Sequence, residues 1–105
     1  MDLRELEAAL AVFAAMEPAN FPVHHIQLFC LVARTGSMSY PEIGRELGLA
    51  SSSVSRSVAA LSETNRHGAG GHGLLVSMRD PDEGRRFIAV LTPRGRAVAR
   101  QLELI

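Results

Sequence analysis

The sequence lacks several features that define whole classes of protein. It has a single cysteine, Cys30, so no disulfide can form within the chain, and a reducing cytoplasm suits it. No stretch approaches the roughly 20 apolar residues that a membrane-spanning helix needs. The amphipathic, acidic start of the chain, with Asp2, Glu5 and Glu7, argues against a secretory signal peptide. We therefore expect a cytoplasmic protein with no membrane partner.

The constellations that enzymes and metal sites need are also missing. There is no arrangement of serine, histidine and acid, no pair of catalytic carboxylates, and no Lys-Ser/Thr after the glycines of residues 68–73, as a phosphate-binding P-loop requires. His24 and His25 are adjacent, so on a helix they point to different faces and rarely chelate one ion. Cys30, inside an apolar helix, fits a small buried hydrophobe better than a redox sensor. We expect no enzyme, no metal and no other cofactor.

The net charge of the chain is zero, which at first argues against a nucleic-acid partner. The charges are unevenly distributed, however. Residues 1–49 carry six acids against three arginines, a net charge of −3, and residues 50–105 carry eight arginines against five acids, a net charge of +3. Every basic residue is arginine, which suits bidentate contacts to phosphate and guanine, although a compositional bias of the genome is the simpler explanation.

Residues 39–61 have the pattern of a helix-turn-helix, two short helices joined by a tight turn. Ser39 is placed to cap the first helix, and Glu42 completes a capping box three residues later. Gly44, beside the apolar face of this helix, leaves room for another helix to cross closely. Gly48 ends the helix, because the left-handed backbone conformation found at such ends is easiest for glycine.

The second helix, expected from its cap Ser51 to Leu61, has one apolar and one polar face. The apolar stripe is Val54, Val58 and Leu61. The opposite face carries Ser52, Ser53, Ser55, Arg56 and Ala59, with Ser57 at its edge. Serine forms helices poorly, so four serines among residues 51–55 are an unfavourable choice for a face that is merely solvated. Short polar side chains allow close approach to base edges, and an arginine can bind guanine or phosphate. We predict that this recognition helix, Ser51 included, enters the major groove of double-stranded DNA.

The rest of the chain completes a winged helix-turn-helix. The pattern predicts helices over residues 2–16 and 23–35, strands over residues 74–78 and 86–91, and a last helix that follows the cap Thr92. The order is α-α-α-α-β-β-α, a mainly α (α+β) fold in one domain over residues 1–105. Two strands directly after a helix-turn-helix form a two-stranded wing.

The wing carries the remaining candidate DNA contacts. Arg85 is the residue expected in the minor groove, because a narrow minor groove attracts arginine. Arg79 and Arg86 are expected to contact DNA beside it, and Arg66, in the glycine-rich loop before the wing, is a candidate phosphate contact. The neighbouring acids suit holding an arginine extended by a charge-assisted hydrogen bond. A solvated turn rich in Asp, Pro and Gly is the alternative interpretation.

Residues 79–95, Arg-Asp-Pro-Asp-Glu-Gly-Arg-Arg-Phe-Ile-Ala-Val-Leu-Thr-Pro-Arg-Gly, resemble the wing of the MarR family of winged-helix transcription regulators, and residues 46–61 resemble its helix-turn-helix. The resemblance implies homodimers with interlocking terminal helices, here residues 2–16 and 93–105, that bind palindromic operators with one recognition helix per half-site. It also implies that Glu83, which replaces an aspartate of the family, orients Arg85. The serines and Arg56 of the recognition helix fall on positions that face DNA in the family.

These patterns lead us to expect a dimeric, sequence-specific DNA-binding regulator, a repressor of MarR type. Its apolar stripe in residues 2–16 (Leu3, Leu6, Leu10 and Phe13, with Met16) is suited to packing outside its own domain. A small-molecule effector is left open. The alternative is a winged-helix module for protein interaction or assembly that binds no operator, which the zero net charge and the lack of the family's long C-terminal helices favour.

Overall fold

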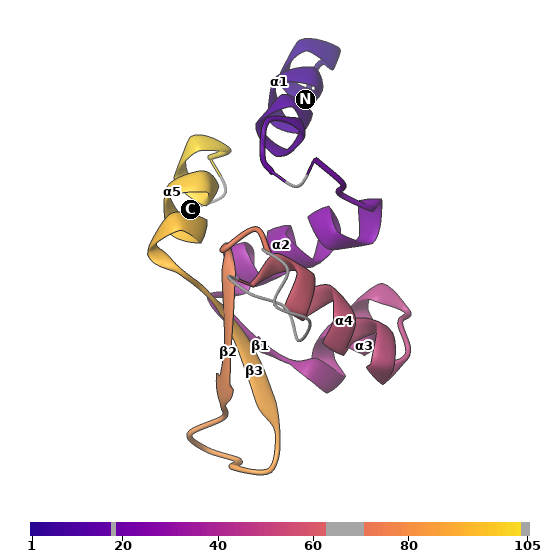
Figure 1. Ribbon diagram of the computed structural model, residues 1–105, viewed down its shortest axis with the longest axis vertical. Coiled ribbons are helices and arrows are strands. Elements are labelled where there is room, and N and C mark those ends of the chain that lie inside the picture. The colour runs from indigo at the N-terminus through magenta and orange to yellow at the C-terminus, as the bar shows by residue number, and fades with distance from the viewer. Residues whose placement is uncertain (18, 63–70, 104–105) are drawn as a thin grey trace.

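The computed structural model of the protein describes residues 1–17, 19–62 and 71–103 (Figure 1). Its elements follow in the order α1 (Leu3–Ala14), α2 (Val23–Thr35), β1 (Ser37–Ser39), α3 (Tyr40–Leu47), α4 (Ser51–Leu61), β2 (Leu75–Arg79), β3 (Phe87–Leu91) and α5 (Pro93–Gln101). The predicted winged helix-turn-helix is confirmed, and the two wing strands each begin one residue later than expected.

Strand β1 is the one element that the sequence pattern did not predict. It is three residues long and pairs antiparallel with β3, with Ser39 opposite Ile88, so the sheet has the order β1-β3-β2. Three residues are too few to show the alternation of apolar and polar side chains by which a strand is recognised. The sheet therefore has a third strand at its base, while the wing itself is formed by β2 and β3.

The first helix of the helix-turn-helix is built as predicted. The hydroxyl of Ser39 accepts a hydrogen bond from the backbone N–H of Glu42 (3.3 Å) and donates one to the Glu42 carboxylate (2.8 Å). A Cβ added to Gly44 would lie 2.9 Å from the carbonyl oxygen of Leu49, so this close passage of the turn requires glycine. Gly48 ends α3 in the left-handed conformation, with φ 66° and ψ 37°.

The predicted cap of the second helix is wrong. Ser51 is the first residue of α4, and Ala50 occupies the cap position without a side-chain hydrogen bond. The backbone N–H of Leu49 still belongs to the turn, where it bonds to the Gly44 carbonyl, and the carbonyl of the extended Ala50 already accepts the first helical bond from the N–H of Val54 at 3.0 Å. The Ser51 hydroxyl is consequently released from a capping role.

The core surrounds α2 and joins it to both halves of the fold. Leu28, Phe29 and Val32 of α2 are fully buried, together with residues of α3, α4 and the sheet: Ile43, Val54, Val58, Leu61, Leu75 and Ala89. A buried side chain of this size contributes about 1.5–3 kcal/mol relative to an exposed one. This shared core holds α4 and the base of the sheet to one body.

The two ends of the molecule project from this body (Figure 1). The wing extends at one end, and α1 lies at the other. Phe13 and Met16 attach the end of α1 to the core, whereas Leu3, Leu6 and Leu10 are 77%, 43% and 46% exposed. None of the helices in the described residues is long and apolar enough to span a membrane.

Candidate nucleic-acid interface

The outward face of α4 carries the side chains predicted for DNA contact. Ser51, Ser52, Ser55 and Arg56 are exposed, and Ser53 is half-buried. Across the described residues, no hydrogen bond or ion pair engages the side chains of Ser52, Ser55 or Arg56. Their donors and acceptors are therefore open to a partner. Ser57, expected at the edge of this face, is instead 1% exposed, because it lies three residues after Val54 and one before Val58, within the buried stripe.

The wing is a hairpin whose two sheet faces differ. Its register pairs Leu75 with Leu91 and Arg79 with Phe87, so alternate residues of both strands face the helices. At the base this face is buried core, and farther out it carries Ser77, Phe87 and Arg79. On the opposite face, Val76 is 46% and Met78 is 49% exposed.

The ion pair at the wing tip differs from the expected one. Asp80 lies opposite Arg86, next after the Arg79–Phe87 pair, and its backbone N–H donates to the Arg86 carbonyl oxygen at 3.0 Å. The Arg86 Nε donates to the Asp80 carboxylate at 3.1 Å. The other Asp80 oxygen accepts the backbone N–H of Asp82 at 2.9 Å, and this bond, assisted by Arg86, lowers the pKa of the Asp80 carboxyl below its ordinary value. Glu83 and Arg85, both in the described part of the wing, form no ion pair. The hairpin register selects Asp80 as the acid partner, and the orienting role of Glu83 stays a prediction.

The three wing arginines have different surroundings. The Arg79 guanidinium donates to the Gly84 carbonyl oxygen at 2.8 Å and lies 5.1 Å from the centre of the Phe87 ring. Arg86 is held by Asp80. Arg85 is exposed and, within the described residues, has no hydrogen-bond partner for its guanidinium. Of the three, Arg85 is thus the one presented without an intramolecular partner, while Arg66 lies outside the described residues.

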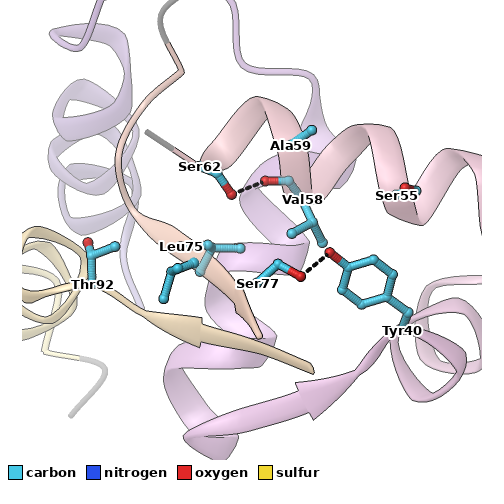
Figure 2. A pocket seen from close by; sticks show the side chains of 9 residues that line it. Tyr40, Ser55, Val58, Ala59, Ser62, Leu75, Ser77 and Thr92 are labelled. Atoms are coloured by element: carbon cyan, nitrogen blue, oxygen red, sulfur yellow. Dashed lines mark hydrogen bonds between the residues drawn. The ribbon is translucent and has the colours of Figure 1, made fainter. Parts of the chain in front are cut away.

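A groove of about 480 Å³ separates α4 from the wing (Figure 2). Ser55 and Ala59 line it from α4, and Leu75 and Ser77 line it from β2. Tyr40, the first residue of α3, reaches across to β2, and its hydroxyl donates to the Ser77 hydroxyl at 2.8 Å. The serine face of the recognition helix and the wing therefore border one groove.

Tyr40 and Ser77 were not anticipated as interface residues. The two are 37 residues apart in the chain, and although Tyr40 belongs to the helix-turn-helix pattern, nothing in that pattern assigns its side chain a role. Their one sequence signal is the alternation of β2, which puts Ser77 on the same face as the buried Leu75. Only the packing of α3 against the hairpin brings the tyrosine there.

Three histidines meet near the end of α4, away from the wing tip. His72 is 2% exposed, its ring is stacked on Phe21 at 3.8 Å, and its Nδ1 lies 3.2 Å from the carbonyl oxygen of Ala60. The pKa of His25 is lowered by burial and, to a lesser extent, by His24 and His72. No group of metal-binding side chains was found among the described residues. Through His72, the segment before β2 contacts the last turn of α4 and Phe21.

The remaining candidate site, Cys30, is half-buried in the body. It lines a hollow of about 350 Å³ between α2 and α3 with Arg34 and Glu46. Burial raises the pKa of its thiol. A raised pKa leaves less thiolate, the reactive form, which favours packing over redox sensing at this residue.

The chain matches no protein-family model, and no curated protein matches it. Solved structures do match. A mutant of the regulator MarR from E. coli, complexed with operator DNA, is 17% identical with a TM-score of 0.67, over 95% of this chain and 61% of that one. This protein has the MarR-type winged-helix fold.

Two further solved structures share this fold. RV1404 from Mycobacterium tuberculosis is 25% identical, with a TM-score of 0.67, over 95% of this chain and 63% of its own. Overoxidized AbfR, bound to DNA, is 18% identical, with a TM-score of 0.66, over 97% of this chain and 65% of its own. This chain thus spans somewhat under two thirds of the length of these three proteins.

Proposed function

We propose that this protein is a sequence-specific double-stranded DNA-binding transcriptional regulator, a dimeric repressor of MarR type. In this proposal α4 enters the major groove, and the wing places Arg85 in the adjacent minor groove. The observation that carries it is the pairing of two surfaces on one MarR-type fold: an exposed serine and arginine face on α4, and a projecting wing that ends in a free arginine. A bound dimer would act by covering promoter DNA and blocking polymerase.

The local chemistry supports a nucleic-acid partner over plain solvation. The side chains of Ser52, Ser55 and Arg56 are exposed and form no hydrogen bond or ion pair within the described residues. DNA binding by these side chains would therefore break no such bond. Arg56 offers a planar donor set that fits guanine or phosphate. Ser53, Arg66, Arg79 and Arg86 belong to the proposed interface as secondary contacts. The proposed role is binding and not catalysis, in the cytoplasm, and an effector ligand remains part of the proposal without an assigned site.

The exposed stripe of α1 supports the dimer. Leu3, Leu6 and Leu10 lie at helical spacing on one face and stay largely exposed, while Phe13 anchors the same face to the core. An apolar stripe of this kind marks a protein contact. We assign it, with α5, to a second copy of the chain. A sedimentation-equilibrium mass of about one 11.3 kDa chain at micromolar concentration would contradict the dimer.

The decisive experiment is selection of bound fragments from random-sequence duplexes, followed by titration of the recovered duplex. Arg56→Ala is expected to weaken binding by about 1–3 kcal/mol and to relax sequence preference, because a base-edge contact is lost. Arg85→Ala is expected to weaken binding by about 1–2 kcal/mol with less effect on preference, since the minor groove carries a more degenerate pattern. Affinity should also fall steeply with salt as phosphate counterions are released.

Arg34→Ala is the matched control. It removes the same charge from an exposed side chain on α2, a helix assigned neither to the DNA interface nor to the dimer contact. It should bind the selected duplex like the parent. If Arg56→Ala and Arg85→Ala also bind like the parent, the interface is assigned to the wrong residues.

A second candidate function is favoured by the outer face of the wing. Val76 and Met78 expose apolar side chains there, and the net charge of the chain is zero, which suits a module that binds another protein without operator contact. Such a module would recover no sequence from the duplex selection and would show no salt-dependent binding. The titration therefore separates the two candidates.

A further inference from the structure

The outer part of the wing has little support from the sheet. Strand β1 pairs with β3 only along Ile88–Val90, so the hairpin beyond Ile88 is a two-stranded ribbon. A ribbon of two strands is marginally stable in water unless something packs against it. The position of the tip that carries Arg85 consequently depends on contacts outside the ladder.

Tyr40 is the residue that directly follows β1, the third strand of the sheet. It directly follows Ser39, which is paired with Ile88, so it lies beside Phe87, the next residue toward the tip. The Tyr40 and Phe87 ring centres are 6.0 Å apart, and the Tyr40 hydroxyl donates to Ser77 at 2.8 Å (Figure 2). The side chain thus contacts β3 at Phe87, where the ribbon begins, and β2 at Ser77, which lies opposite Ala89 just inside the three-stranded part.

The same contacts continue to the tip. Arg79 lies over the Phe87 ring at 5.1 Å and donates to the Gly84 carbonyl oxygen at 2.8 Å. Gly84 directly precedes Arg85. An unbroken series of side-chain contacts therefore runs from the first residue of α3 to the peptide next to the proposed minor-groove arginine.

We infer that Tyr40 is a positioning residue, which sets the distance between the recognition helix and the wing tip through Ser77 and Phe87. The inference rests on the proposed function and adds a residue that itself contacts no DNA. In this inference the Arg79 guanidinium stabilises the conformation of the wing tip through Gly84, in place of the secondary DNA contact proposed above. Tyr40 lies on the same short helix-turn-helix that presents α4, so its bond to β2 fixes one DNA-contacting element relative to the other.

The test compares Tyr40→Phe and Ser77→Ala, which remove the two ends of one hydrogen bond and keep the ring contact. Each should weaken binding of the duplex selected by the parent by about two- to tenfold, the range for one neutral hydrogen bond. The double variant should bind no worse than either single variant, because both remove the same interaction. Ser62→Ala is the matched control: Ser62 lines the same groove, but its hydroxyl donates to Val58 within α4, so binding should stay at the parental level.

Combination with Arg85→Ala distinguishes positioning from a general effect on stability. If Tyr40 acts through the wing tip, Tyr40→Phe should have no further effect on binding when Arg85 is already alanine. The same two- to tenfold loss in both backgrounds would overturn the inference, as would parental binding by Tyr40→Phe.

A measurement without DNA separates this inference from the proposed function. Amide ¹⁵N relaxation should show lower order parameters at Gly84 and Arg85 in Tyr40→Phe than in the parent, with α4 unchanged. Failure of the parent to select any duplex would refute the DNA-binding proposal alone. Unchanged order parameters at the tip would refute the positioning role of Tyr40, whatever the parent binds.

Discussion

The recognition helix and the wing are held in place by different means. α4 packs on the core through Val54, Val58 and Leu61, none of which is more than 1% exposed. On β2 the wing leaves the core after Leu75. Exposed contacts then support it: the Tyr40–Ser77 hydrogen bond near its base, and the Arg79–Gly84 hydrogen bond in its outer half. Burial fixes an element by many small contacts, whereas the wing is fixed by a few polar ones. The helix should therefore be rigid and costly to disturb, and the wing adjustable.

Truncation of the core under α4 should have the largest effect. Leu61→Ala is expected to lower the free energy of unfolding by about 2–5 kcal/mol, because it leaves a cavity beneath the helix. Met78→Ala, on the exposed face of the wing, should change it by no more than about 0.5 kcal/mol. Urea denaturation monitored by circular dichroism measures both. Similar losses for the two variants would mean that the regions are not supported differently.

Glycine substitutions should divide the two regions in the same way, with a smaller effect. Gly44→Ala brings a Cβ to 2.9 Å from the Leu49 carbonyl oxygen, so the α3–α4 turn must shift at an expected loss of about 1–3 kcal/mol in unfolding free energy. An added Cβ at Gly84 meets nothing within 4 Å, and Gly84→Ala should be close to neutral. Thermal melts of both variants check this, and equal melting temperatures would disprove the close approach.

Acidification should have the smallest effect and should act on the body first. The folded state lowers the pKa of His25 below its ordinary value of 6.5, so below pH 6.5 the unfolded chain binds more protons at this residue than the native one. Stability is therefore lost as pH falls below 6.5. The Asp80 pKa is lowered from 3.8, so the wing pair should persist until the solution is far more acidic.

His25→Gln is the variant that checks this prediction. Urea unfolding followed between pH 7.5 and 5.5 should show a weaker loss of stability in His25→Gln than in the parent. An identical pH dependence in the two proteins would assign the proton uptake to other groups.

Local patterns predicted the helix-turn-helix well, since its signals are short-range. Ser39 and Glu42 are three residues apart, and Gly48 ends α3 by its own backbone conformation. The prediction of Ser51 as a cap was wrong because it rested on the general preference of serine for that position. In the structure Ala50, which directly follows the hydrogen-bonded turn after Gly44, occupies the cap position. The geometry of the preceding turn therefore determined the cap, and the preference of serine for cap positions did not.

The wing was predictable as a hairpin but not in its side-chain contacts. Its alternating apolar residues and its Pro and Gly turn located both strands to within one residue. Which acid pairs with which arginine depends on register, and the register places Asp80 opposite Arg86. A sequence with three acids and three arginines in eight residues does not distinguish among these pairs.

The sequence by itself determined the five helices, their apolar faces and the two wing strands, because helical period, caps and turn glycines act over a few residues. The tertiary structure alone decided which arginines are free and which side chain supports the wing. Tyr40 and Ser77 are 37 residues apart in the chain, and the three residues of β1 are too few for the sequence to predict a strand. The contact between the two side chains therefore depends on how the strands align in the sheet. Contacts of that kind are fixed by packing and register, which no local pattern encodes.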